Sequence, residues 1–269
     1  MADDSDQILT QQDGPPFDLI NGTGRGDVLL VCEHAANAVP RRLNDLGVTS
    51  DVLEAHVAWD PGAFPVARAL SEALDAALFH ARFSRLVYDC NRPPEATDAI
   101  PAKSELYDIP GNAGLSTKAR EARATEIYRP FRAGLERVIE KRAARGQPTV
   151  LVTIHSFTPV YFGKRRDVGI GILHDADSRL ADAMLEAAPR LTKLSTRRND
   201  PYGPEHGVTH TLREHALPRG LANAMIEIRN DQITTPAEQA DMAAMLARMI
   251  GAGVAALGQA NGQRKKAGG

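Results

Sequence analysis

The sequence predicts an α/β fold, because strand-like apolar runs alternate with segments of helical periodicity. Three runs, over 28–32, 149–154 and 224–226, are continuous and mostly aliphatic or β-branched. Runs of this kind are typical of strands that are buried on both faces of a sheet. Between the first two, residues 63–78 carry apolar side chains at three- and four-residue spacing, which indicates an amphipathic helix.

Each of the three runs ends in an acid or a histidine. Glu33 and His34 follow the first run, His155 follows the second, and Glu227 follows the third. In open α/β sheets, ligands bind beyond the carboxyl ends of the strands. Two histidines and two carboxylates at such an edge suit a metal-assisted hydrolase, which needs ligands for a cation and a base for its water.

In the first half of the chain, the sequence patterns that predict the other helices and strands are weaker. Leucines at helical spacing indicate a short helix over 40–46, and apolar runs indicate strands over 78–81 and 85–90. Residues 95–115 are rich in Pro, Gly and Asp, and a long irregular segment in a compact domain is usually functional. A long helical region follows over 116–144, with serine and threonine at its start as caps.

The second half repeats the alternation of strands and helices. The patterns predict a buried strand over 168–173, a helix over 176–191 and a strand over 222–228. The polar segment 196–215, with three histidines, is predicted to be a second active-site loop. A final helix opens at Thr235, where a threonine, a proline and a glutamate form an N-terminal capping pattern.

Composition favours a single catalytic domain that is soluble and cytoplasmic. The 269 residues are 43% apolar and 25% charged with a net charge of −2, so we expect no nucleic acid and no membrane partner. No apolar stretch reaches the roughly 20 residues of a membrane span, and the acidic N-terminus is unlike a signal peptide. We expect a flexible arm over 1–24, the domain over 25–260 and a frayed basic tail over 261–269, with a homo-oligomer allowed.

His34 and His155 are the first candidates for metal ligands, because neutral imidazole is the usual nitrogen ligand of zinc. A catalytic zinc site uses three protein ligands, and the third could be Glu33, Asn37 or Asp60. A Pro-Gly turn follows Asp60 and would expose its carboxylate. Either histidine alone could instead be a hydrogen-bonded core residue.

Two further groups could act on a substrate. Glu227 lies in a buried apolar strand, where an ionised carboxylate is costly unless it is paired or functional, and burial would raise its pKa toward the range of a general base. Its structural alternative is an ion pair with Arg229. Asn91 and Arg92 end the predicted strand 85–90, where they could hold a substrate carboxylate, although a surface salt bridge would also explain Arg92.

Six motifs make the chain similar to the N-formylglutamate amidohydrolase family. They are Val31–Pro40, Trp59–Gly62, Ser84–Pro93, Ile154–Phe157, His206–Thr211 and Ile226–Asp231. Together they cover roughly residues 28–233 in order, so the similarity extends over the whole domain. It implies a fold like that of zinc carboxypeptidases and acylamino-acid deacylases, a three-layer α/β/α sandwich around a mixed, mostly parallel sheet.

The resemblance also implies roles for the candidate residues. It implies a divalent metal, Zn²⁺ first, on His34 and His155, and a water molecule activated by Glu227. Arg92, with Asn91, would hold the substrate carboxylate.

The third ligand is where the chain departs from the related enzymes. Carboxypeptidases follow the first histidine with a glutamate three residues later, whereas Asn37 stands at that position here. Because an amide is a poor zinc ligand, Asp60 is expected to be the third ligand, ahead of Glu33. Arg85 is expected to help stabilise the tetrahedral oxyanion.

The resemblance implies a small-molecule substrate, N-formyl-L-glutamate of histidine breakdown, although a family does not fix the acyl group or the amino acid. His206, His210 and the segment 164–166 form a cationic rim suited to an acidic substrate, but the segment could equally be a solvated loop. A deacylase of another N-acylamino acid or small amide, and a non-catalytic binding protein, remain alternatives. A serine hydrolase is disfavoured because no Gly-x-Ser-x-Gly motif occurs.

Overall fold

A seven-stranded sheet forms the centre of the protein, as the computed structural model describes it over residues 7–267, with side chains described over 7–259. The strand order is β1-β3-β2-β6-β11-β9-β10. The strands are β1 (Phe17–Ile20), β2 (Val28–Cys32), β3 (Ala77–Ala81), β6 (Val150–Phe157), β9 (Ile170–Leu173), β10 (Thr196–Arg198) and β11 (Asn223–Arg229). Two short hairpins stand outside the sheet: β4 (Lys103–Ser104) with β5 (Tyr107–Asp108), and β7 (Val160–Tyr161) with β8 (Lys164–Arg165).

The sheet is mixed and mostly parallel, as predicted. β2 pairs in parallel with β3 and β6, β6 with β11, and β9 with β10. Only β1 against β3 and β9 against β11 run antiparallel. The carboxyl ends of β2, β6 and β11, three adjacent strands, therefore meet at one edge.

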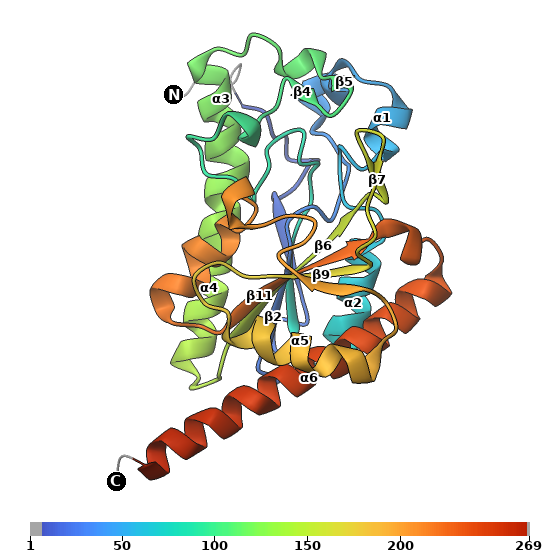
Figure 1. Ribbon diagram of the computed structural model, residues 1–269. Helices are drawn as coiled ribbons and strands as arrows, with labels where there is room; N and C mark the ends of the chain where they lie inside the picture. Colours follow the sequence, from blue (N-terminus) through green and yellow to red (C-terminus); the bar gives the residue numbers. More distant parts are fainter. Residues whose placement is uncertain (1–6, 268–269) are drawn as a thin grey trace.

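Helices cover both faces of the sheet and complete the α/β/α sandwich (Figure 1). One core holds α2 (Ala63–Ala73), α5 (Arg179–Leu191) and α6 (Pro236–Ala267) against residues such as Leu30 and Val152. The other core holds α4 (Arg129–Ala144), with α3 (Thr117–Arg123) leading into it, against Leu29 and Val31. Successive residues of β2 thus enter opposite cores, as the alternation of side chains along a strand requires.

The last helix, α6, is long and apolar, and its segment Pro236–Gln259 could cross a membrane by length and composition alone. Leu246, Met249 and Ile250 are fully buried in the core that α2 and α5 share with it. The part of α6 up to Ile250 is therefore a core helix of the sandwich, whereas most residues over 251–259 are exposed. It begins with the predicted cap, because Thr235 Oγ1 accepts a hydrogen bond from the Glu238 amide and the Glu238 carboxylate accepts one from the Thr235 amide.

The predicted strand over 85–90 is wrong, because this segment forms turns. Its apolar residues are buried, including Leu86 and Val87, but the backbone bonds to other loops: the Arg85 amide donates to Ala58 and the Asp89 amide to Ala99. An apolar run shows that a segment is buried, and it does not show whether a neighbouring strand is available to pair with it.

Other boundaries also differ from the sequence expectations. Residues 17–20, within the predicted arm, form the edge strand β1. The predicted helix over 40–46 is a 3₁₀ segment with left-handed backbone at Asn44, Asp45 and Leu46. α6 continues to Ala267, so residues 261–267 of the predicted tail are helical.

A candidate metal centre at the sheet edge

Three side chains that are distant in sequence converge at the carboxyl edge of the sheet. His34 directly follows β2, and His155 lies within β6. Asp60 lies in the loop before α2, where its amide donates to the His34 carbonyl at 3.0 Å. All three are buried, and we call them the metal triad.

The geometry of the metal triad fits a shared cation. His34 Nδ1 lies 3.2 Å and His155 Nδ1 lies 2.9 Å from Asp60 Oδ2, and the two nitrogens are 3.2 Å apart. Ligand atoms 2.0–2.1 Å from a tetrahedral zinc ion are separated by about 3.3 Å. Two imidazole nitrogens and a carboxylate oxygen at this spacing are a donor set that zinc accepts.

Each histidine of the triad has a further carboxylate next to its second ring nitrogen, Nε2. His34 Nε2 lies 2.7 Å from Asp89 Oδ1, and His155 Nε2 lies 3.1 Å from Glu33 Oε2. The Asp89 contact is a hydrogen bond, which fixes the tautomer of His34 and leaves its Nδ1 free to face a metal, whereas Glu33 pairs with His155 by charge, without hydrogen-bond geometry. Glu33 thus lies behind His155 rather than beside Asp60, and the Asn37 amide donates to the Leu53 carbonyl.

The three ionisable side chains of the metal triad lie close together and are buried from solvent. Burial alone would raise the pKa of Asp60, but His34 and the hydrogen bond from His155 outweigh it and hold the pKa well below its usual range. Burial would lower the pKa of His155, but Glu33 and Asp60 raise it well above its usual range. The pocket therefore attracts a proton or another cation.

Glu227 lies next to the triad, in the register position of β11 directly opposite His155. Burial is the main cause that raises its pKa to about 7, and the neighbouring Asp60 adds to the rise. Its Oε2 atom has no hydrogen-bond partner among the described residues. Glu227 also lines the same cavity as the triad, so it can exchange a proton with a molecule bound there.

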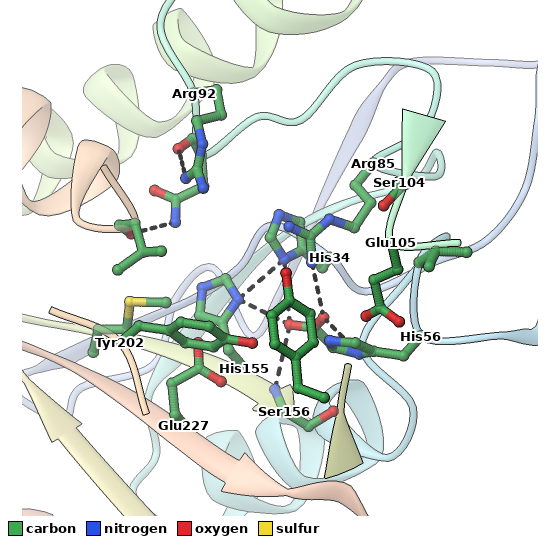
Figure 2. A pocket seen from close by; sticks show the side chains of 16 residues that line it. His34, His56, Arg85, Arg92, Ser104, Glu105, His155, Ser156, Tyr202 and Glu227 are labelled. Atoms are coloured by element: carbon green, nitrogen blue, oxygen red, sulfur yellow. Dashed lines mark hydrogen bonds and ion pairs between the residues drawn. The ribbon is translucent and has the colours of Figure 1, made fainter. Parts of the chain in front are cut away.

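Two arginines line this cavity of about 190 Å³ (Figure 2). Arg85 donates to Asp60 at 3.4 Å and to Asp89 at 3.2 Å, so its guanidinium connects the two carboxylates of the site. Arg92 donates from Nε to Asp98 at 2.8 Å and from Nη1 to the Gly207 carbonyl at 3.0 Å.

Asn91 lines the cavity, but both ends of its amide are used by the protein. Nδ2 donates to the Val208 carbonyl at 2.5 Å, and Oδ1 accepts from the Thr211 amide at 3.0 Å. Asn91 therefore ties the loop of Arg92 to the segment around residue 208, which positions Arg92 at the cavity wall.

The structure does not bring the two predicted substrate-binding histidines into this cavity. His206 and His210 line a neighbouring depression of about 320 Å³, which shares Arg92 with the cavity. His210 Nε2 lies 2.8 Å from the Tyr128 hydroxyl, and His206 Nδ1 accepts from the Gly203 amide. They could contact only a molecule that extends past Arg92.

Several residues of the cavity wall were not named as candidates from the sequence, among them His56, Glu105, Tyr161 and Tyr202. His56 stands four residues before Asp60, a signal that could have been used, and its Nδ1 lies 3.6 Å from Asp60 Oδ1. Glu105 and Tyr202 lie in 95–115 and 196–215, the two segments predicted to be functional, but nothing in the sequence singled out these residues, and Tyr161 lies in the hairpin strand β7.

Of the three basic residues in segment 164–166, two lie at the surface and one contacts the cavity wall. Lys164 and Arg165 are exposed in β8. The Arg166 guanidinium lies 4.5 Å from the ring of Tyr161 and 4.9 Å from the ring of Tyr202, so it braces the two tyrosines of the cavity wall.

The buried group His34, Asp60 and His155, which could hold a metal ion, thus shares one cavity of an α/β sandwich with Glu227 and two arginines. The sequence pattern of the N-formylglutamate amidohydrolase family matches residues 26–234. The chain therefore belongs to this family, whose members are hydrolases of amide bonds.

Solved structures that resemble this chain include the following two. Gene product Atu2144 from Agrobacterium tumefaciens is 55% identical with a TM-score of 0.91, over 93% of this chain and 99% of that one. The N-formylglutamate amidohydrolase from Ralstonia eutropha JMP134 is 19% identical with a TM-score of 0.58, over 87% of this chain and 97% of that one, which shows a shared fold. A search of curated proteins finds no match.

Proposed function

We propose that the protein is a metal-dependent amidohydrolase that removes the acyl group from an N-acylamino acid. The observation that carries the proposal is Glu227, whose unpartnered oxygen and pKa of about 7 stand beside the metal triad in one cavity. Family membership supports an amide as the substrate. N-formyl-L-glutamate is the first substrate to test, and zinc is the first metal.

The residues of the site divide the chemistry between them. A divalent cation held by the metal triad would lower the pKa of a water molecule and polarise the scissile carbonyl. Glu227 takes a proton from the attacking water, whose oxygen forms the new bond to the acyl carbon. The same carboxyl group gives a proton to the amide nitrogen as the C–N bond breaks. A pKa near 7 suits both transfers.

The two arginines serve opposite ends of the substrate. Arg85 is a quarter exposed to the cavity, and its guanidinium stabilises negative charge that develops on the carbonyl oxygen. Arg92 holds the substrate carboxylate through Nη2, because Nε and Nη1 already donate to Asp98 and to backbone carbonyls. Asn91 acts through Arg92, by fixing the loop on which Arg92 stands.

The variant Glu227→Gln tests this mechanism. It keeps the shape of the side chain and removes the base, so kcat should fall by about 10²- to 10⁴-fold, while the metal content measured by elemental analysis should stay the same. Steady-state hydrolysis of N-formyl-L-glutamate and a panel of other N-acylamino acids gives the rate.

Asp231→Asn is the matched control, since Asp231 follows the same strand but pairs with Arg229 away from the cavity. It should retain the wild-type rate. A Glu227→Gln protein with near-wild-type turnover would remove Glu227 from the mechanism, and a wild-type protein that binds these compounds without hydrolysing them would favour a binding role.

A further inference from the structure

Two hairpins at the mouth of the cavity carry exposed apolar side chains. Ser104 and Glu105 of the β4–β5 hairpin line the cavity, as does Tyr161 of the β7–β8 hairpin. The exposed large hydrophobic residues of the described chain all lie on these hairpins: Leu106, Tyr107, Val160, Tyr161 and Phe162. We call them the apolar rim. Apolar side chains gathered at one exposed place commonly mark a binding surface.

Glu105 adds a negative charge to this part of the cavity. Its side chain lines the cavity, and no hydrogen bond or ion pair joins it to another described residue. It stands at the tip of the hairpin with a φ of +51°, a conformation that is unfavourable for residues other than glycine. A carboxylate without a partner in a cavity favours a cationic ligand group and disfavours an anionic one.

The β4–β5 hairpin lies across the metal triad from Arg92. In Figure 2, Arg92 stands on one side of His34 and His155, and Ser104, Glu105 and His56 stand on the other. In the proposed function, Arg92 holds the carboxylate of the amino acid and the triad faces the scissile carbonyl. The acyl substituent therefore points toward Glu105 and the apolar rim.

We propose that this half of the site binds an acyl group larger than formyl, one that carries both an ammonium group and an apolar side chain, as an aminoacyl group does. A formyl group has only hydrogen on its carbonyl carbon, so it reaches neither Glu105 nor the rim. The inference rests on the proposed function and narrows its substrate class to dipeptide-like amides. Glu105 is then a specificity-determining residue.

Three N-acyl derivatives of glutamate separate the contribution of the apolar side chain from that of the ammonium group. They are N-formyl-, N-(4-methylpentanoyl)- and N-leucylglutamate, of which the last two differ only in the ammonium group. For the zinc-loaded protein, kcat/KM should rise about 10-fold from formyl to 4-methylpentanoyl through apolar contact. It should rise a further roughly 5-fold to leucyl through the ion pair with Glu105.

Two variants and one control assign these gains to residues. Glu105→Gln should abolish the gain from the ammonium group and leave the apolar gain, with the change in KM rather than kcat. Tyr161→Ser removes the residue of the apolar rim that lines the cavity, so it should abolish the apolar gain and leave the gain from the ammonium group. Asp108→Asn removes an equal charge from the same hairpin, but Asp108 is 83% exposed and does not line the cavity, so the ranking of compounds should not change.

The outcomes distinguish this inference from the proposed function. If the formyl compound is hydrolysed best, or if Glu105→Gln leaves the ranking unchanged, the aminoacyl site is refuted while the amidohydrolase stands. If no compound is hydrolysed, the proposed function fails, and calorimetry of the same three compounds with zinc-loaded protein still decides the inference. Equal affinity for the leucyl and 4-methylpentanoyl compounds would overturn it.

Discussion

The two nitrogens of each triad histidine have separate tasks. Nδ1 faces the other two ligands, whereas Nε2 is hydrogen-bonded to Asp89 in His34 and lies 3.1 Å from the Glu33 carboxylate in His155. Both carboxylates are almost fully buried, so they are not free to rotate into solvent. They position the imidazoles, and their effect should appear first in metal affinity.

Glu33→Gln and Asp89→Asn should each weaken zinc binding by about 10- to 100-fold, because such partners fix the tautomer and basicity of the ligand. Competition with a chromophoric chelator measures the affinity. Asp231→Asn should leave it unchanged. An unaltered zinc affinity in both variants would show that the carboxylates serve only packing.

The pH dependence of the reaction should report on Glu227. Its folded pKa is raised to about 7, so the carboxylate that accepts the proton is lost as the pH falls through that value. A bound cation favours the charged form and moves the transition lower. The logarithm of kcat/KM should therefore fall on the acid side with an apparent pKa at or below about 7, and Glu227→Gln should lack this limb. An acid limb that persists in the variant would contradict the assignment.

The role of Glu33 could not be predicted from its position in the sequence. It is the neighbour of His34, which suggests that the two act together. In the structure, however, the Glu33 carboxylate lies against Nε2 of His155, on the adjacent strand β6, on the opposite side of that ring from the nitrogen that faces His34. Only the strand order gives this contact, and the strand order comes from the fold.

At the scale of elements, the turn before α2 decides where Asp60 lies. Gly62 caps α2 with a φ of +80°, and a Cβ atom there would lie 2.6 Å from the Ile233 carbonyl oxygen. The sequence predicted an exposed carboxylate from this Pro-Gly turn, whereas Asp60 is buried and packed against both histidines. A turn is readable from local residues, but its burial depends on the loops that cover it.

Replacing Gly62 by alanine should destabilise the protein by about 3 kcal/mol, from about 1 for the left-handed backbone and about 2 for the clash. Gly114→Ala is the control, since Gly114 has a φ of +64° with nothing within 4 Å, and it should lose only about 1 kcal/mol. Denaturant unfolding measures both. Equal losses would show that the close approach to Ile233 has no effect.

At the scale of the whole molecule, the parallel strands explain how much of the site could be predicted from the sequence. His34, His155 and Glu227 all follow or end apolar runs, and adjacent parallel strands bring such ends together. Part of the cavity wall comes from two hairpins without regular periodicity; the sequence indicated that segment 95–115 is functional, but it could not single out Glu105 or Tyr161.

The central claim is that hydrolysis depends on a cation held by the metal triad. Its most direct test measures the rate of N-acylamino acid hydrolysis by protein purified without chelators, then after exhaustive chelation, then after zinc is restored. We predict that activity is lost with the metal and returns with about one zinc ion per chain. Full activity in the chelated, metal-free protein would contradict the account.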